Sequence, residues 1–117
     1  MRAKRAKKIW KFRIPIVGGA TTLTLPKNPM GPVFSPVKLS IPEYGKRSTV
    51  EDPHIEMWCE VVSDPSPEDM VTVALEVVGT GMEISSHACH IGTVIDPEGG
   101  LVWHVYEVAV DRAKDTD

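Results

Sequence analysis

The chain has 117 residues, of which 42% are hydrophobic and 25% charged, and this balance predicts one globular domain with an ordinary core. No segment approaches the ~18 consecutive apolar residues of a membrane-spanning helix, and no apolar stretch with a small-residue cleavage site marks a secretion signal. We therefore expect a soluble intracellular protein that makes no membrane contact. The net charge of −3 combines 13 basic and 16 acidic residues.

Basic residues are concentrated at the start of the chain, where seven of the thirteen precede Ile14 and no acidic residue accompanies them. A cationic start on an acidic body indicates a binding partner more than it indicates a fold. We divide the chain into a basic N-terminal arm at residues 1–7, a single β domain at residues 8–110 and a polar C-terminal tail at residues 111–117.

Alternating hydrophobicity predicts the first strands. Residues 8–14 (KIWKFRI) place Trp10 and Phe12 on one face and basic residues on the other, as in a half-buried strand. The turn-forming residues 15–19 (PIVGG) lead into a β-branched strand at residues 20–25. Two strands joined by so short a turn predict a hairpin.

Prolines and turn residues separate the next strands. Residues 26–36 contain four prolines and form a loop or an extended edge segment. A short strand follows at residues 37–41, and the polar residues 42–54 form the longest connection. The strand at residues 55–62 alternates apolar residues with Glu56, Trp58 and Glu60.

The second half of the chain reads in the same way. Alternation predicts strands at residues 70–79, 89–95 and 101–110, and the last two form a hairpin around residues 96–100. No 12-residue window combines a helical apolar stripe with a cap and a stop signal. About seven short antiparallel strands separated by Gly and Pro turns predict an all-β sandwich or small barrel.

An isolated histidine, His104, lies within the apolar run GGLVWHVYE at residues 99–107. Strict alternation places it in one row with Val102, Tyr106, Val108 and Val110, opposite Leu101, Trp103, Val105, Glu107 and Ala109. We expect His104 to be a half-buried structural residue that is hydrogen-bonded to backbone or water.

The sequence HACH at residues 87–90 is the best candidate for a metal site. In a strand, His87 and Cys89 point the same way and His90 points the other way, so the segment supplies at most two of the four zinc ligands. Further ligands would have to come from His54, His104 or Cys59. We predict no metal and no cofactor.

Catalytic patterns are also missing from the sequence. Cys59 and Cys89 lie in apolar strand-like runs, where we expect buried, reduced thiols rather than activated nucleophiles. The carboxylates fall mostly in turns, and the short glycine pairs lack the lysine and helix of a phosphate loop. We predict that the protein is not an enzyme.

Partner binding is therefore the expected activity. The residues that we expect to contact a partner are the arm cations and three residues of the longest connection: Arg2, Lys4, Arg5, Lys7, Lys8, Tyr44, Lys46 and Arg47. With Trp10 and Phe12, the arm could also hold nucleic acid or a nucleotide through phosphate contacts and stacking. The opposing interpretation is a solubilising tail, with both aromatic side chains in the core.

The order of several motifs resembles a family of small uncharacterised bacteriophage proteins. The matching motifs are KIWKFRIPI, TLTLP, EMWCEVVSDP, VVGTG, HIGTV and GGLVWHVYE, and they span about residues 8 to 109. The resemblance implies no activity, ligand or catalytic residue. Two segments depart from the pattern, the basic residues 1–7 and the longer connection at residues 42–54.

We predict a phage-encoded, non-enzymatic binding protein that engages a host or defence component in the host cytoplasm. One alternative is a virion component, such as a minor capsid or decoration protein. Another is a protein that sequesters a signalling nucleotide. In each case we expect a homo-oligomer, because a small sheet with free edges tends to pair them.

Overall fold

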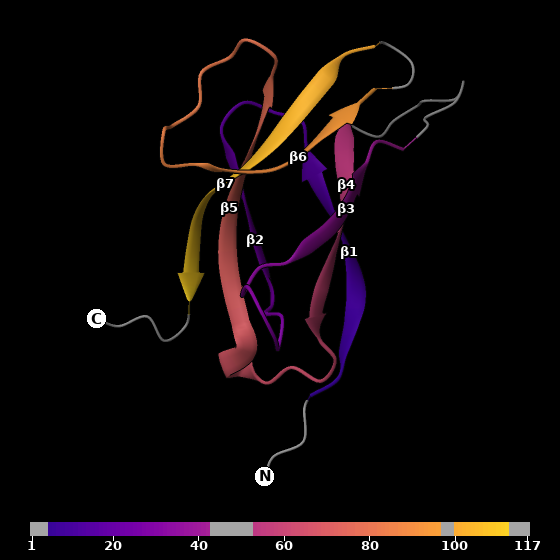
Figure 1. Ribbon diagram of the computed structural model, residues 1–117, viewed down its shortest axis with the longest axis vertical. Coiled ribbons are helices and arrows are strands. Elements are labelled where there is room, and N and C mark those ends of the chain that lie inside the picture. Colours follow the sequence, from indigo (N-terminus) through magenta and orange to yellow (C-terminus); the bar gives the residue numbers. More distant parts are fainter. Residues whose placement is uncertain (1–4, 43–52, 97–99, 113–117) are drawn as a thin grey trace.

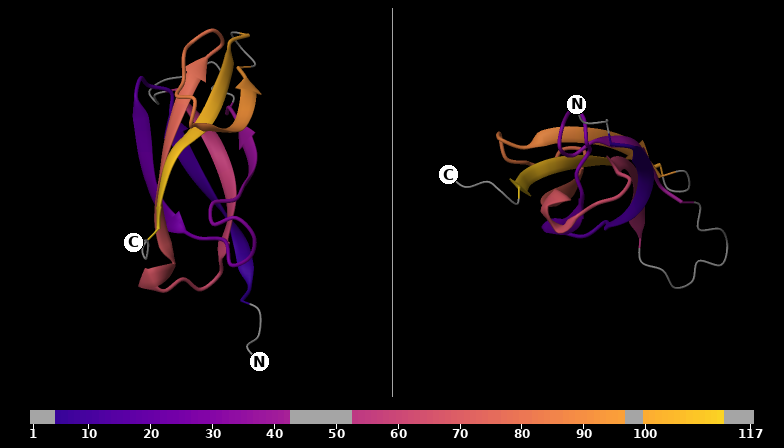
Figure 2. Two further views of the ribbon diagram at one scale, coloured as in Figure 1. Left: turned by 60° about the vertical axis from the view of Figure 1, so that its left-hand side comes forward. Right: turned by 90° about the horizontal axis from the view of Figure 1, so that it is seen from below.

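The computed structural model describes residues 5–42, 53–96 and 100–112, and over these ranges the protein consists of two antiparallel sheets packed face to face (Figures 1 and 2). The all-β prediction is confirmed. The strands described are β1 (Lys7–Pro15), β2 (Ala20–Pro26), β3 (Pro36–Ser40), β4 (His54–Val62), β5 (Met70–Gly79), β6 (Cys89–Ile95) and β7 (Val102–Arg112). A single 3-10 turn, Pro67–Asp69, is the helical structure in this part of the chain, and it contains no helix that could cross a membrane.

Strand order defines the two layers. The three-stranded sheet has the order β1-β4-β3, and the four-stranded sheet has the order β2-β5-β7-β6. β1 runs antiparallel to β4 with Lys11 opposite Trp58. β2 pairs with β5, and β6 pairs with β7. The hairpin expected between the last two strands is therefore confirmed.

The hairpin predicted between the first two strands is wrong, because β1 and β2 belong to different sheets. The connecting residues 16–19 carry the chain from one layer to the other, and Gly19 adopts a φ of +89° at the turn, which favours glycine. Ile14 of β1 and Leu25 of β2 are both buried in the core between the layers. The two strands thus contribute to one core from opposite layers instead of lying side by side.

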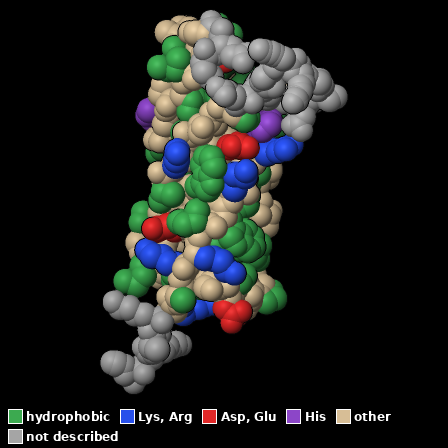
Figure 3. All heavy atoms as spheres, turned by 90° about the vertical axis from the view of Figure 1, so that its right-hand side faces the viewer, with side chains coloured by type: hydrophobic (Ala, Val, Ile, Leu, Met, Phe, Trp, Pro, Cys, Tyr) green, Lys and Arg blue, Asp and Glu red, His purple; other side chains and the backbone are tan. Residues whose placement is uncertain are grey.

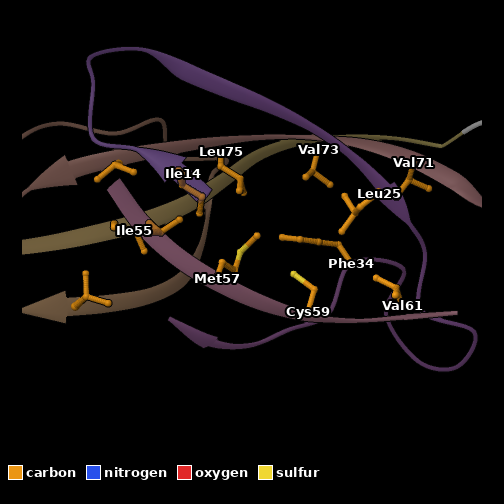
Figure 4. Close-up of a cluster of buried hydrophobic side chains, with 13 residues drawn as sticks. Ile14, Leu25, Phe34, Ile55, Met57, Cys59, Val61, Val71, Val73 and Leu75 are labelled. Atoms are coloured by element: carbon orange, nitrogen blue, oxygen red, sulfur yellow. The ribbon is translucent and has the colours of Figure 1, made fainter. Parts of the chain in front are cut away.

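The core lies between the sheets and follows the predicted alternation (Figure 4). Alternate residues of β4 and β5 are buried, and the intervening residues are only partly covered except for His54, Val62 and Val78, which are buried as well. Burial of aliphatic side chains from both layers supplies the main stabilisation of such a sandwich. The buried apolar cluster consists of Ile14, Leu25, Phe34, Ile55, Met57, Cys59, Val61, Val71, Val73, Leu75, Val77, Val94 and Val105.

The proline-rich segment predicted as a loop at residues 26–36 is a loop over residues 27–35, between β2 and β3. This loop also contributes to the core. Phe34 is 8% exposed and lies between Leu25 and Cys59 in Figure 4. Buried Asn28 fixes the loop, since its side-chain NH₂ donates to Glu60 at 3.2 Å and its carbonyl accepts from the Met30 amide at 3.0 Å. The sequence patterns did not predict a core residue here.

Irregular pairing in β3, β6 and β7, with one extra residue in each of these described strands, changes which residues share a face. On β7 the pairing passes from Glu107 opposite Leu75 to Ala109 opposite Ala74, so Val108 is an extra residue. An extra residue exchanges the two faces of the strand beyond it. The strict alternation predicted across residues 101–110 is therefore interrupted between Glu107 and Ala109.

Candidate interaction surface

The outward face of the three-stranded sheet is organised around Trp58. Its ring lies beneath two ammonium groups, Lys11 Nζ from β1 at 5.8 Å and Lys38 Nζ from β3 at 5.5 Å from the ring centroid. The sheet register causes this contact, because Lys11 and Lys38 are the residues paired with Trp58 on its two sides. Each contact falls within the range of a cation–π interaction.

We call this surface the lysine–tryptophan face, and it carries more basic than acidic groups. Figure 3 shows this side of the molecule, with Lys and Arg side chains around hydrophobic ones. Ile9 lies on it and is 50% exposed, which leaves apolar area beside the charges. The residues that define the face are Lys7, Ile9, Lys11, Arg13, Lys38, Glu56, Trp58 and Glu60.

Carboxylates are interleaved with the cations on this face. Lys7 Nζ lies 3.0 Å from Glu60 Oε1, and Lys11 Nζ lies 3.5 Å from Glu56 Oε2. The lysine side chains are 45% and 51% exposed, whereas those of the glutamates are 28% and 19% exposed. The ammonium groups are therefore the more accessible members of each pair, and such exposed pairs hold weakly enough to exchange partners.

Arg5, which precedes β1, is bound to the domain by an ion pair and hydrogen bonds. Its guanidinium donates to both carboxylate oxygens of Asp69, at 3.1 and 2.8 Å, and to the Asp64 carbonyl at 3.1 Å. Asp69 is buried, and it also accepts from the Ser66 amide at 2.8 Å. The bonds from Arg5 and Ser66 hold the pKa of Asp69 well below its usual value, so this pair fastens the N-terminal segment to the turn before β5.

The predicted partner-contact residues fall into different environments. Arg5 forms an ion pair with Asp69, Lys7 belongs to the lysine–tryptophan face and Lys8 is exposed on β1. Five others lie outside the described residues, namely Arg2, Lys4, Tyr44, Lys46 and Arg47. Of the two arm aromatics, Phe12 packs against the core, while Trp10 on the same side of β1 remains 36% exposed.

Sequence reasoning did not single out Trp58 or Lys38 as functional. The signal was present in part, because alternation placed Trp58 with two glutamates on the outward side of its strand. A large aromatic residue between charged ones on a solvated face is unusual and favours an interface. Its lysine partners follow only from the strand order β1-β4-β3.

The histidine of the last strand lies on the outward face of the other sheet. His104 is half-buried, as predicted. Both ring nitrogens meet threonine hydroxyls, since Nε2 lies 3.0 Å from Thr80 Oγ1 and Nδ1 lies 3.0 Å from Thr93 Oγ1. The Thr93 hydroxyl is also 3.0 Å from His90 Nε2, so a continuous chain of hydrogen bonds crosses β6 and β7.

The two cysteines are both free but differ in exposure. Cys59 is buried in the core, where desolvation raises the pKa of its thiol to about 12. The expectation of a buried thiol is wrong for Cys89, which is exposed at the start of β6. Within the described ranges, no group of three or more His, Cys, Asp or Glu side chains is arranged to hold a metal ion.

We expect one thiol of the native protein to react with a chromogenic disulfide reagent at pH 8 and both to react after unfolding. Only the exposed thiol is accessible, and the raised pKa of Cys59 keeps that group protonated at this pH. Cys89→Ser should abolish the native reaction, and Cys59→Ser should leave it unchanged. Rapid reaction of two thiols in the folded protein would contradict the burial of Cys59.

Comparison with known proteins places nearly the whole chain in one family. A family model described as a domain of unknown function (DUF7352) matches residues 5–116. No curated protein and no solved structure matches the chain. We therefore infer a function from the residues on the outward faces of the three-stranded and the four-stranded sheet.

Proposed function

The chain belongs to the DUF7352 family of unknown function, and we propose that it is a non-enzymatic binding protein that holds an acidic segment of a partner protein on the lysine–tryptophan face. The observation that carries this proposal is Trp58 flanked by Lys11 and Lys38 at 5.8 and 5.5 Å. Tryptophan and cationic side chains at the centre of a surface are typical of the few residues that dominate binding energy.

The charges of the face favour a protein over a nucleic acid as the partner. Binding of a phosphate backbone depends on neutralising successive phosphates with cations, and the carboxylates of Glu56 and Glu60 interrupt the cations here. A peptide segment with carboxylates beside apolar side chains matches the pattern better, because it can pair with the lysines and cover Ile9 and Trp58.

The resemblance of the sequence motifs to bacteriophage proteins supports a partner in the host cell. Under this proposal the protein is a phage-encoded accessory protein that engages a host or defence component in the cytoplasm. Steering by exposed lysines would speed association with an acidic target and make it sensitive to salt.

Site-specific photo-crosslinking in host cells tests this proposal. A benzophenone amino acid at position 9 lies on the face, and the same group at position 22, exposed on β2 of the other sheet, is the matched control. We expect one host protein to be crosslinked from position 9 and not from position 22. The double change Lys11→Glu with Lys38→Glu should reduce that adduct about tenfold, the effect of losing a central binding residue.

Thr22→Glu is the charge control, since it adds a carboxylate on the opposite layer, and it should leave the adduct unchanged. Equal adducts from both positions, or an adduct that survives the double charge reversal, would refute the role of the face. Recovery of the adduct only in purified particles, with a virion protein as partner, would replace the host target with a structural role.

A further inference from the structure

Two imidazole nitrogens on the outward face of the four-stranded sheet converge on one point. His90 Nε2 from β6 and His104 Nδ1 from β7 each lie 3.0 Å from Thr93 Oγ1. The ring centroids are 6.3 Å apart and the ring planes are inclined by 50°. Both nitrogens therefore direct a lone pair or a proton at the position that the hydroxyl oxygen occupies.

A β-bulge creates this convergence. Residues 90 and 93 of a regular strand point to opposite faces, because their separation is odd. On β6 the pairing passes from His90 opposite Tyr106 to Gly92 opposite Val105, so Ile91 is an extra residue that brings His90 and Thr93 to the same face. Bulges that redirect a side chain occur often at functional sites.

The second nitrogen of His104 is held in the manner typical of metal ligands. Its Nε2 lies 3.0 Å from the Thr80 hydroxyl, which belongs to the turn after β5. When Nε2–H donates to this oxygen, Nδ1 is unprotonated and presents its lone pair to the point of convergence. A ligating histidine usually has its other ring nitrogen fixed by such a hydrogen bond.

We propose that His90 Nε2 and His104 Nδ1 together bind one divalent transition-metal ion such as Zn²⁺. Imidazole favours borderline ions such as Zn²⁺, Cu²⁺ and Ni²⁺ over Mg²⁺ and Ca²⁺, which prefer oxygen ligands. A Zn–N bond of ~2.1 Å is reached when the rings close by about 1 Å each and the Thr93 hydroxyl turns aside. His90 and Thr93 are exposed, so their side chains have room for this rearrangement.

Water completes the coordination of the ion. No third His, Cys, Asp or Glu joins the pair among the residues that the structure describes, and the exposed sides of His90 and Thr93 face solvent. The ion would link β6 to β7 and so stabilise the hairpin by mass action. This site lies on the opposite layer from the lysine–tryptophan face and is independent of the proposed function.

Zinc binding by the untagged full chain tests the proposal. The dissociation constant for Zn²⁺ is measured at pH 7.5 by competition with a chromogenic chelator. We expect saturable binding of one ion, with His90→Ala and His104→Ala each weakening it about tenfold or more. His87 is exposed just before β6, so His87→Ala is the matched control and should bind zinc as the unaltered chain does.

A second readout separates ligation from loss of structure. In long-range nitrogen NMR spectra, zinc should shift the ring signals of His90 Nε2 and His104 Nδ1 in the unaltered protein and leave those of His87 in place. Failure of the chain to bind zinc, equal affinity of the His90→Ala or His104→Ala variant, or unmoved signals of the two rings would overturn the proposal.

Discussion

Replacing Phe34 with alanine is expected to lower the free energy of unfolding by about 3 to 5 kcal/mol, the usual cost of removing a buried phenylalanine ring. The ring is 8% exposed and lies in the apolar cluster between the two sheets, beside Leu25 and Cys59 in Figure 4. Its removal leaves a cavity in the apolar cluster between the two sheets. Urea denaturation followed by tryptophan fluorescence measures the change.

Met30→Ala is the control for this prediction. Met30 belongs to the same loop but is 49% exposed, so its loss should change the free energy of unfolding by less than about 0.5 kcal/mol. Equal effects of the two substitutions would show that the loop contributes through its backbone alone, and that the Phe34 ring does not help to hold the sheets together.

Asp69→Asn is expected to lower the free energy of unfolding by about 2 kcal/mol at pH 7, because the carboxylate is buried and accepts charge-assisted hydrogen bonds. Its oxygens accept two bonds from Arg5 and two from Ser66. Asparagine retains one acceptor oxygen and places an NH₂ group against donors. The exposed position of the Arg5 side chain, at 44%, limits the part due to the ion pair itself.

The same carboxylate makes the stability depend on pH. The folded pKa of Asp69 lies well below its usual value, whereas the unfolded pKa is ~3.9. The unfolded chain therefore takes up a proton first as the pH falls, and the stabilisation present above about pH 4 is progressively lost below it. The thermal midpoint of the unaltered protein should fall more steeply between pH 4 and pH 2 than that of Asp69→Asn.

Asp64→Asn provides the matched control, since the Asp64 side chain is exposed and Arg5 contacts only its backbone carbonyl. This variant should follow the unaltered protein in both stability and pH dependence. If Asp69→Asn showed the same loss of stability in acid as the unaltered chain, the ion pair between Arg5 and Asp69 would not contribute to the stability of the fold.

Strands with strict alternation between strong turn signals were predicted most closely. β5 and β6 begin and end at the predicted residues. Segments rich in Gly or Pro lie on both sides of β5 and directly after β6. The alternation in β4 also identified four of its six buried residues, Ile55, Met57, Cys59 and Val61, but not His54 and Val62 at its ends. Local pattern is sufficient in these cases, since burial on one face is what produces the pattern.

Features that depend on distant residues were missed. The chain passes between sheets after β1, although the same residues could form a hairpin, because the pattern of a strand does not specify its neighbour. The bulges at Ile91 and Val108 each insert one residue, which alternation alone does not reveal. Phe34 was missed because its proline-rich surroundings indicate a loop, and loops seldom supply core residues.

The two outward faces show the same division between local and distant information. Alternation predicted that Lys11 and Trp58 lie on the faces of their strands opposite to the apolar faces. Only the strand order brings them together with Lys38. His90 and His104 were candidate ligands for a metal site, but in a regular strand His90 points away from His87 and Cys89. The bulge in β6 instead brings His90 to the same face as Thr93.

The passage of the chain between layers has a kinetic consequence. β1 pairs with β4, which is distant in the sequence, as the pairing of Lys7 with Val62 shows. In the same way β2 pairs with β5, with Ala20 opposite Glu76. Each pairing closes a loop of roughly fifty residues, and this closure costs chain entropy that contacts between the strands offset only afterwards. Such a high contact order predicts refolding in milliseconds to seconds, with the β6–β7 hairpin able to form early and β1 among the last strands to join its sheet.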